Sequence, residues 1–311
     1  MTEQYAGPAV ERIGELFWAM TTLGAAVFLL FCLALAFALV HKRRPVGPPT
    51  PERDRRGARA IVLLGAVVPA LILVPLFIWT ISAIHALDPR SEEPHLVVDV
   101  VGKQWWWEIR YRDSVPGKVF TTANELHVPV GRRVELRLAS TDVIHSFWVP
   151  ELQGKTDLIP GRENVTWIQA DRPGVYDGRC AEYCGIQHAT MGLLVVAQPE
   201  AEYEAWAVRQ RRSAAAPRDS LAERGRDAFL GSACALCHTV RGTAAGGNAG
   251  PDLTHVASRR TLASGLLPNS PGHLGGWIAN PQALKPGSRM PRVQMSAEQF
   301  SLIHRYLQSL E

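Results

Sequence analysis

A run of twelve residues concentrates the side chains with the strongest metal-binding chemistry in this 311-residue chain. It reads Cys180-Ala-Glu-Tyr-Cys184-Gly-Ile-Gln-His188-Ala-Thr-Met191 and brings two thiols, an imidazole and a thioether into one short segment. Soft thiolate and thioether ligands combined with imidazole favour copper over magnesium, calcium or manganese. A mononuclear copper site needs only one of the two cysteines, so the second cysteine suggests two copper ions bridged by two thiolates.

A disulfide between Cys180 and Cys184, or half of a zinc site, would be a simpler interpretation of the same run. Neither accounts for Met191, because a zinc site more usually takes its remaining ligands from cysteine or histidine. A copper site of this kind still needs a second histidine from a distant part of the chain. His145, within residues 140–150, is the best candidate.

A second chemical signature lies further along the chain. The sequence Cys234-Ala-Leu-Cys237-His238 matches the pattern for covalent attachment of a c-type haem, in which the cysteines form thioethers and the histidine binds the iron. A thioredoxin-like redox pair would need a βαβ context, which this region lacks. Methionine as the other axial ligand raises the reduction potential and suits electron transfer. Met290 is the expected ligand, and Met295, next to a predicted helix start, is its competitor.

Two uncharged stretches, residues 16–40 and 60–84, are each long enough to cross a bilayer. The arginine-rich segment His41–Arg59 between them predicts a cytoplasmic loop, because positively charged loops stay on that side. Residues 1–91 therefore predict a transmembrane hairpin in the cell (inner) membrane, retained rather than cleaved as a signal peptide. Everything after Leu87 is then periplasmic or extracellular. The net charge of +4 comes largely from the loop and does not predict nucleic-acid binding.

Residues 92–208 predict an all-β domain. Five segments in it are rich in β-branched residues and partly alternate in polarity: 95–101, 125–130, 133–138, 164–169 and 192–197. Pro-Gly turn signals separate several of them, which is the pattern of a β-sandwich or barrel. Both parts of the copper ligand set are then expected in loops between strands, where a rigid sandwich can fix their geometry.

Residues 209–219 are charged and poor in apolar side chains, and predict a linker to a last domain at residues 220–311. Two capping boxes, Ser220-Leu-Ala-Glu223 and Ser296-Ala-Glu-Gln299, predict helix starts in that domain. Apolar residues after the second box fall on one helical face. The sequence therefore predicts a small α-helical domain whose modest core is completed by a covalently held haem.

These features together resemble subunit II of cytochrome c oxidase with a cytochrome c domain fused to its C-terminus. The resemblance covers nearly the whole chain and includes, besides the segments above, residues 102–107 and 155–162. It implies a membrane-anchored multidomain protein: a two-helix transmembrane hairpin, an all-β cupredoxin-like Greek-key sandwich and a small all-α cytochrome c domain. The implied function is to pass electrons from cytochrome c, or from the fused haem, through a dinuclear copper centre to subunit I, which reduces oxygen.

The resemblance also implies which residues hold the metals. Five side chains and one backbone carbonyl form the implied ligand set of the dinuclear copper: His145, Cys180, Cys184, His188, Met191 and the carbonyl of Glu182. The side chain of Glu182 is implied to reach a magnesium ion at the boundary with subunit I. Asp157 and Arg162 are expected near that region.

Three consecutive tryptophans, Trp105 to Trp107, receive different interpretations. Trp105 matches the tryptophan through which copper in this family receives electrons from cytochrome c. Trp106 and Trp107 are expected to pack at a membrane-proximal surface. The expected partners are oxidase subunits I and III, cytochrome c or another redox donor, and membrane lipid, with no nucleic acid.

One departure from the family pattern keeps other functions open. The second transmembrane helix of the family commonly carries a glutamate at the mouth of a proton pathway into subunit I, whereas residues 60–84 contain no carboxylate. Either a partner subunit supplies that group or the proton path differs. The corresponding subunit of a related nitric oxide reductase is therefore an alternative, as are a membrane-tethered copper and haem electron carrier without a partner and a copper-delivery protein.

Overall fold

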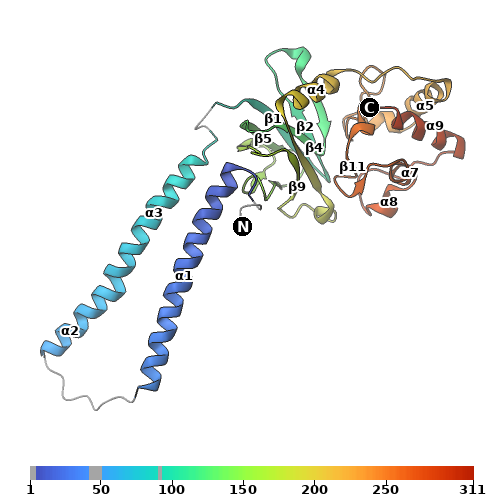
Figure 1. Ribbon diagram of the computed structural model, residues 1–311. Helices are drawn as coiled ribbons and strands as arrows, with labels where there is room; N and C mark the ends of the chain where they lie inside the picture. The colour runs from blue at the N-terminus through green and yellow to red at the C-terminus, as the bar shows by residue number, and fades with distance from the viewer. Residues whose placement is uncertain (1–4, 42–50, 90–92) are drawn as a thin grey trace. The chain divides into compact units, whose positions relative to one another are not determined.

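The computed structural model describes residues 5–41, 51–89 and 93–311. The chain divides into two compact units. Residues 11–91 make up the helical unit, and residues 1–10 with 92–311 make up the unit that contains the β-domain and the C-terminal helices (Figure 1).

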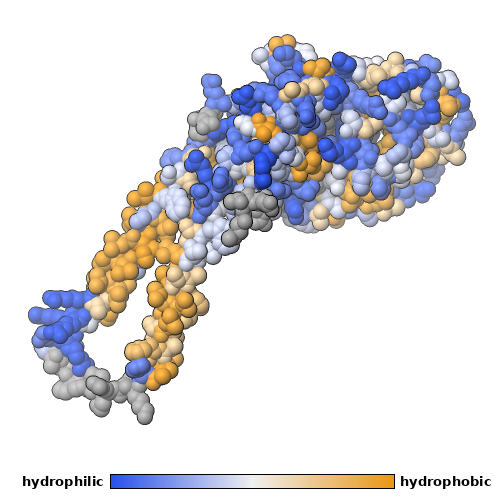
Figure 2. Space-filling view, viewed as in Figure 1, coloured by the Kyte–Doolittle hydropathy of each residue, from blue (hydrophilic) through white to orange (hydrophobic). Residues whose placement is uncertain are grey.

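The helical unit contains two long helices. One is α1 (Pro8–Val40), and the other runs from α2 (Pro51–Val62) through a π-helical turn, η2 (Leu63–Val67), into α3 (Val68–Ala86). Both are long and apolar enough to cross a membrane. Figure 2 shows that hydrophobic side chains cover most of their surface. Their length and apolar composition are those of two membrane-spanning helices.

The arginine-rich segment between the spans is not a loop throughout. Its residues 42–50 lie outside the described part of the chain, but residues 51–59 form the first turns of α2. Arginine and alanine are good helix formers, and Glu52 and Asp54 lie in the first turn, where they complement the helix dipole. Arg56 also pairs with Glu52 one turn earlier. The prediction of a loop is therefore wrong for this half of the segment.

The β-domain consists of two five-stranded sheets. The first has, in spatial order, β3 (Phe120–Ala123), β2 (Trp106–Tyr111), β1 (Leu96–Lys103), β5 (Val134–Ser140) and β8 (Asn164–Ile168). The second has β4 (Glu125–Pro129), β10 (Gly192–Gln198), β9 (Gly174–Cys180), β6 (His145–Trp148) and β7 (Thr156–Leu158). β1 pairs in parallel with β5, and β4 with β10, while the other pairs are antiparallel. The five predicted strands are present as β1, β4, β5, β8 and β10.

The core of the β-domain lies among the inward-facing side chains of these strands, and burial alternates along β5 as a two-residue period requires. Trp107 is fully buried there and packs edge-on against Phe147, with ring centroids 6.1 Å apart. The expectation that Trp107 packs at a surface is therefore wrong, because its place in β2 turns it into the core. Trp106 points to the other side of the strand and lies beneath the Lys103 ammonium, 4.9 Å from its ring centroid.

Helix α4 (Glu200–Arg211) covers one end of the β-domain. Its Trp206 stacks on His127, with ring centroids 4.0 Å apart. The helix continues to Arg211 and buries Gln210, so the irregular connection to the C-terminal region begins after the first residues of the segment expected as a linker.

The C-terminal region is mainly helical. Its elements are α5 (Ser220–Leu230), α6 (Cys234–Cys237), α7 (Pro271–Ala279), α8 (Pro281–Leu284), α9 (Ala297–Gln308) and a short hairpin of β11 (Thr261–Leu262) and β12 (Leu267–Pro268). Short 3-10 turns occur here and in the β-domain: η3 (Pro116–Lys118), η4 (His188–Thr190) and η5 (Val256–Ser258). α5 and α9 cross closely at Gly225, where a Cβ atom would lie 2.2 Å from the Leu302 carbonyl oxygen.

Capping side chains begin the two outer helices of this region. Ser296 and Gln299 form the predicted capping box at the start of α9. The other predicted box is wrong by one residue: Asp219 is the N-cap of α5 and accepts from the amide of Ala222, while Ser220 is already helical. Asp219 also binds Arg305 of α9, which ties the two helix ends together.

Candidate copper and haem sites

The candidate copper ligands come from two neighbouring strands and the segment that follows one of them. His145 is the first residue of β6 and Cys180 the last residue of β9, and these strands pair with each other. His188 lies in the turn η4 and Met191 directly after it. The expectation that all ligands lie in loops is therefore wrong for His145 and Cys180, which the sheet itself positions.

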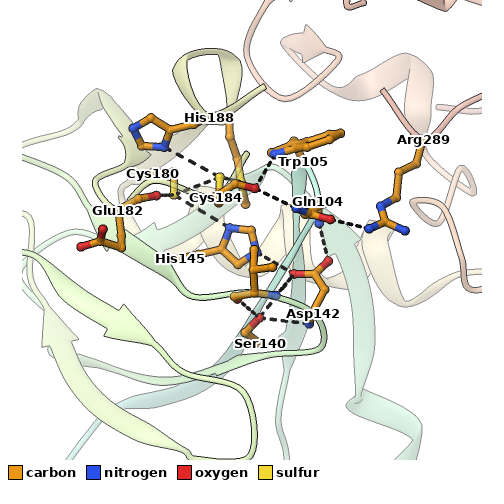
Figure 3. A network of polar contacts seen from close by, with 12 residues as sticks. Gln104, Trp105, Ser140, Asp142, His145, Cys180, Glu182, Cys184, His188 and Arg289 are labelled. Atoms are coloured by element: carbon orange, nitrogen blue, oxygen red, sulfur yellow. Dashed lines mark hydrogen bonds and ion pairs between the residues drawn. The ribbon is translucent and has the colours of Figure 1, made fainter. Parts of the chain in front are cut away.

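The two cysteine sulfurs lie at the centre of the cluster (Figure 3). Their separation of 3.8 Å is far longer than a disulfide bond, and both thiols are free and buried. His145 Nδ1 lies 3.9 Å from the Cys180 sulfur, and His188 Nδ1 lies 3.8 Å from the Cys184 sulfur. Each sulfur therefore has its own imidazole.

Two further donor atoms complete the ring around the sulfurs. The Met191 sulfur lies 3.8 Å from the Cys184 sulfur, and the Glu182 carbonyl oxygen lies 3.2 Å from the Cys180 sulfur. The six donor atoms predicted from the sequence are thus gathered in one place. Two thiolates with an imidazole each, a thioether and a carbonyl suit a soft metal such as copper.

The protons of the two thiols respond to each other. The hydrogen bond between the two sulfurs lowers the pKa of the Cys180 thiol, and the same bond together with burial raises the pKa of Cys184. The pair therefore keeps one proton between its sulfurs in the absence of a cation. A metal ion that replaces this proton would compensate both negative charges in the buried site.

Asp142 orients His145. Its carboxylate oxygen Oδ1 lies 2.8 Å from His145 Nε2, and Oδ2 accepts from the Gln104 amide at 2.7 Å. Burial disfavours the charged imidazolium, but the hydrogen bonds to Cys180 and Asp142 outweigh it and raise the pKa of His145. A carboxylate on the far nitrogen of a ligating histidine fixes the ring and its tautomer. Asp142 is not among the site residues predicted from the sequence, although its position three residues before His145 is a usable signal.

The backbone leaves no spare room behind the His145 ring. A Cβ atom at Gly102 would lie 2.7 Å from that ring. Gly102 belongs to β1, in the opposite sheet, so the ring is held between the two layers. Only glycine fits this approach.

Trp105 and Gln104 both bind the ligand segment. The Trp105 indole donates to the Cys184 carbonyl oxygen at 3.0 Å, and the Gln104 side-chain amide donates to the same oxygen at 2.8 Å. The Trp105 ring also lies against Gly185, where a Cβ atom would come within 2.9 Å of it. The tryptophan singled out in the sequence therefore touches the backbone of a candidate copper ligand.

The Glu182 side chain points away from the sulfurs (Figure 3). Its carboxylate is partly exposed and lies 3.9 Å from the Lys155 ammonium. Asp157 pairs with Ser146 between β7 and β6, and Arg162 lies in the following turn. Glu182 is therefore reachable from outside the β-domain.

The residues of the haem-attachment motif lie on and just after α6. Cys234 and Cys237 are the first and last residues of this helix, and His238 follows as its C-cap. His238 Nδ1 donates to the Pro251 carbonyl oxygen at 2.8 Å, which leaves Nε2 free to bind iron. Burial lowers the pKa of His238, and the nearby Arg259 guanidinium adds to this effect. The imidazole is therefore kept in the neutral form that a metal requires.

Two features near His238 fit a haem. A Cβ atom at Gly250 would lie 2.6 Å from the His238 ring, so glycine allows the chain to support the imidazole closely. The Nε atom of Arg259 is buried and has no hydrogen-bond partner within the described ranges. A haem carries carboxylates that can pair with such a group, so the residues present fit the cofactor.

The two methionines differ in their surroundings. Met290 lies in an irregular segment that Gln282 braces by donating to the carbonyl oxygens of Ser288, at 2.8 Å, and Met290, at 2.7 Å. Met295 packs against the hydrophobic core of the C-terminal region. This difference favours Met290 as the residue that remains free for iron.

The chain has two apolar helices long enough to anchor it in a membrane, and its other unit carries a cysteine and histidine cluster and a haem-attachment motif. These features define a membrane-bound electron-transfer protein. The profile of the family "Cytochrome C oxidase subunit II, periplasmic domain" matches residues 96–198, and that of "Cytochrome c" matches residues 222–311. Cytochrome c oxidase subunit 2 of Alkalihalophilus pseudofirmus is 36% identical to it, over 94% of this chain and 84% of that protein. The chain belongs to the cytochrome c oxidase subunit II family.

The chain is also similar to a further relative and to one solved structure. Cytochrome c oxidase subunit 2 of Bacillus subtilis is 28% identical, over 88% of this chain and 82% of that protein. Among solved structures, the periplasmic domain of subunit II of cytochrome oxidase from Bradyrhizobium japonicum is 30% identical, with a TM-score of 0.37 over 39% of this chain and 96% of that one.

The family membership confirms several predictions from the sequence. The chain is a subunit of a haem-copper oxidase that works in a complex with other oxidase subunits, and its families bind copper and haem c. It is anchored by two apolar helices and carries an exterior domain. The predicted order of a helical hairpin, a β-sandwich and a helical cytochrome c region is also confirmed.

Proposed function

We propose that this subunit binds two copper ions bridged by the thiolates of Cys180 and Cys184. The other proposed ligands are His145, His188, Met191 and the carbonyl of Glu182. The observation that carries the proposal is the pair of free, buried sulfurs 3.8 Å apart, each with its own imidazole. When bound, the copper pair and the haem supply one-electron carriers.

The protein surroundings of the proposed copper site favour rapid electron exchange. Asp142 and Gly102 hold the His145 ring in one orientation, and the two sulfurs sit at the edge of the sandwich core, away from water. Ligands that are held rigidly in this way move little when the metal gains or loses an electron. The reorganisation energy of electron transfer is therefore small.

For the haem, the proposed attachment residues are Cys234 and Cys237, and the proposed axial ligands are His238 and Met290. Methionine ligation gives an absorption band near the red end of the spectrum. Met290→Ala should remove this band and lower the reduction potential, while Met295→Ala should leave both nearly unchanged. The reverse result would transfer the ligand role to Met295.

We further propose the electron route and the partners. A haem held by Cys234, Cys237 and His238 would take electrons from cytochrome c or another donor, Trp105 would lie on the route to copper held by Cys180 and Cys184, and that copper would supply oxidase subunit I. The hydrogen bond from the Trp105 indole to the Cys184 carbonyl supports this route. Subunit III is a further proposed partner, the inner membrane the proposed location, and Glu182 the proposed link to a magnesium ion at the boundary with subunit I.

The direct test counts the copper ions in the purified chain. Two coppers per chain with a seven-line electron paramagnetic resonance pattern, from one unpaired electron shared by both ions, are expected. One copper per chain, with both cysteines reduced and intact, would rule out the bridged pair.

A further inference from the structure

Lys285 is a buried lysine in the cytochrome c region. Its positive charge has no role in the function proposed above. Its side chain is only 3% exposed. The ammonium donates to three backbone carbonyl oxygens: those of Trp105 at 3.1 Å, Thr190 at 2.8 Å and Ala263 at 3.0 Å. An ammonium has three donor hydrogens, so this set satisfies all of them. Burial lowers the pKa of Lys285 to about 8, and the group therefore stays mostly protonated at neutral pH.

The three carbonyls come from different parts of the molecule. Trp105 precedes β2 and Thr190 directly precedes Met191, so both belong to the β-domain next to the candidate copper site. Ala263 belongs to the cytochrome c region, just after β11. One side chain thus joins three segments that are far apart in the sequence.

The residues after Lys285 continue the same contact. Gln187 donates to the Pro286 carbonyl oxygen, and Arg289 donates to the side-chain oxygen of Gln104 (Figure 3). Gly287 has a φ of +79° and approaches Ile186 so closely that a Cβ atom there would overlap its side chain. We call residues 285–289 the docking segment. It lies on the residues around Trp105 and on the segment that holds the copper ligands, and it ends one residue before Met290, the proposed iron ligand.

The residues on both sides of Ala263 make further contacts with the β-domain. Glu125 of β4 is buried, and its Oε1 accepts from the amides of Arg260 at 2.6 Å and Thr261 at 2.8 Å. Nearby, the Gly192 amide donates to the Ser264 carbonyl oxygen at 3.0 Å, and the Ser264 hydroxyl donates back to the Gly192 carbonyl at 2.7 Å. The cytochrome c region is therefore attached to the β-domain both through Lys285 and through residues 260–264.

We propose that Lys285 is a positioning residue that fixes the cytochrome c region on the copper side of the β-domain in a single docked arrangement. This inference rests on the proposed function and adds to it that the haem is a docked donor rather than one that swings on a tether. Its ammonium binds three backbone carbonyls, is not among the proposed metal or haem ligands, and acts through the docking segment. The rate of electron transfer falls as the distance between donor and acceptor grows, so a fixed arrangement has a direct effect on that rate.

The first experiment measures docking without using activity. Amide hydrogen exchange is followed in the full chain with copper and haem bound, comparing the wild type with Lys285→Met. The amides of Thr261 and Gly192, which bond across the contact, should exchange at least about tenfold faster in the variant, because charged hydrogen bonds are lost. The amides of Leu193 to Ala197 in β10, which do not bond to the cytochrome c region, should be unchanged. Lys118→Met, at an exposed lysine in η3, is the matched control and should behave as the wild type.

The second experiment measures the rate after flash reduction of the haem. One electron leaves the ferrous haem, which becomes ferric, and the copper centre gains that electron. In the wild type the rate should be independent of solvent viscosity. In Lys285→Met it should fall at least about tenfold and become dependent on viscosity, because transfer then waits for the regions to meet. The copper and haem contents of the variant should match the wild type.

Arg289 is exposed, so the variant Arg289→Gln does not disturb a hydrophobic core. It should raise the exchange of the same amides by a smaller factor, about twofold to threefold. If Thr261 and Gly192 exchange at the wild-type rate in both variants, the docking role of Lys285 is overturned. If docking depends on Lys285 but the wild-type haem never reduces the copper, the proposed electron route fails instead.

Discussion

The copper site and the haem site of this chain are built in different ways. The copper donor atoms lie within 3.2–3.9 Å of the central sulfurs, positioned by strand ends that pair across a sheet. The haem residues sit on a one-turn helix and in an irregular segment, and the buried Arg259 Nε beside them has no partner within the described part of the chain. A site on a complete core is formed before its metal arrives, whereas a site in a small core depends on its cofactor.

The cores behind the two sites explain this difference. The copper cluster is continuous with the larger hydrophobic core, which includes Cys180, Cys184 and Met191 among its buried members. The core of the cytochrome c region is smaller and includes Cys234 only as a partly buried neighbour. The copper ligands are therefore part of a packed interior, and the haem cysteines lie at the border of theirs.

The largest expected effect is on the copper site alone. Cys180→Ser should abolish binding of the bridged pair of copper ions, because a serine hydroxyl is too hard a ligand to bridge copper. The haem spectrum should be unchanged. Copper content and the electron paramagnetic resonance signal measure the loss, and Cys32→Ser, in α1, is the matched control that should keep both coppers. Retention of two coppers in Cys180→Ser would contradict the bridging role.

Removing each cofactor tests whether the two sites really differ in preorganisation. Chelation of copper should leave the β-domain folded and its thermal unfolding cooperative. A chain without haem, made with Cys234→Ala and Cys237→Ala, should lose cooperative unfolding of the cytochrome c region, because its core is incomplete. Amide hydrogen exchange distinguishes the two regions. If the amides of both regions were equally protected from exchange without their cofactors, the two sites would not differ in preorganisation.

A smaller effect should follow from Asp142→Asn. The carboxylate no longer fixes the His145 ring, and copper affinity should fall about 10–100-fold. Competition with a copper chelator measures the affinity. Asp99→Asn is a suitable control, because Asp99 pairs with Arg112 on the same domain away from the copper ligands. An affinity equal to that of the wild type would show that the packing at Gly102 alone orients the ring.

The smallest expected effect concerns a helix end in the cytochrome c region. Asp219→Ala should lower its thermal unfolding midpoint by roughly 2–4 °C, whereas Ser220→Ala should not, because Asp219 is the N-cap. The hydrogen bond with Arg305 lowers the pKa of Asp219. The stabilisation is therefore present above the unfolded pKa of about 3.9 and is lost as the pH falls through the lower folded value. If Ser220→Ala lowered the unfolding midpoint more than Asp219→Ala, Ser220 would be the N-cap, as predicted from the sequence.

The sequence by itself determined the features that depend on neighbours along the chain. The haem motif at residues 234–238 and most copper ligands at residues 180–191 are local patterns, and the two apolar spans follow from composition alone. Five strands were predictable from β-branched runs. The other five strands of the β-domain were not, because short strands such as β6 and β7 gain their stability from pairing rather than from propensity.

Only the tertiary structure decided which distant residues meet. Nothing in the sequence around Trp107 separates this core tryptophan from its half-buried neighbour Trp106, since only the direction of β2 in its sheet does so. Asp142 gains its role from the strand that carries His145 towards Cys180. Lys285 lies in a Lys-Pro-Gly turn that looks like any exposed loop, yet three carbonyls from separate segments surround it. Local sequence encodes ligand chemistry, whereas the long-range packing of backbone carbonyls and rings, which has no local pattern, decides how the sites are oriented and joined.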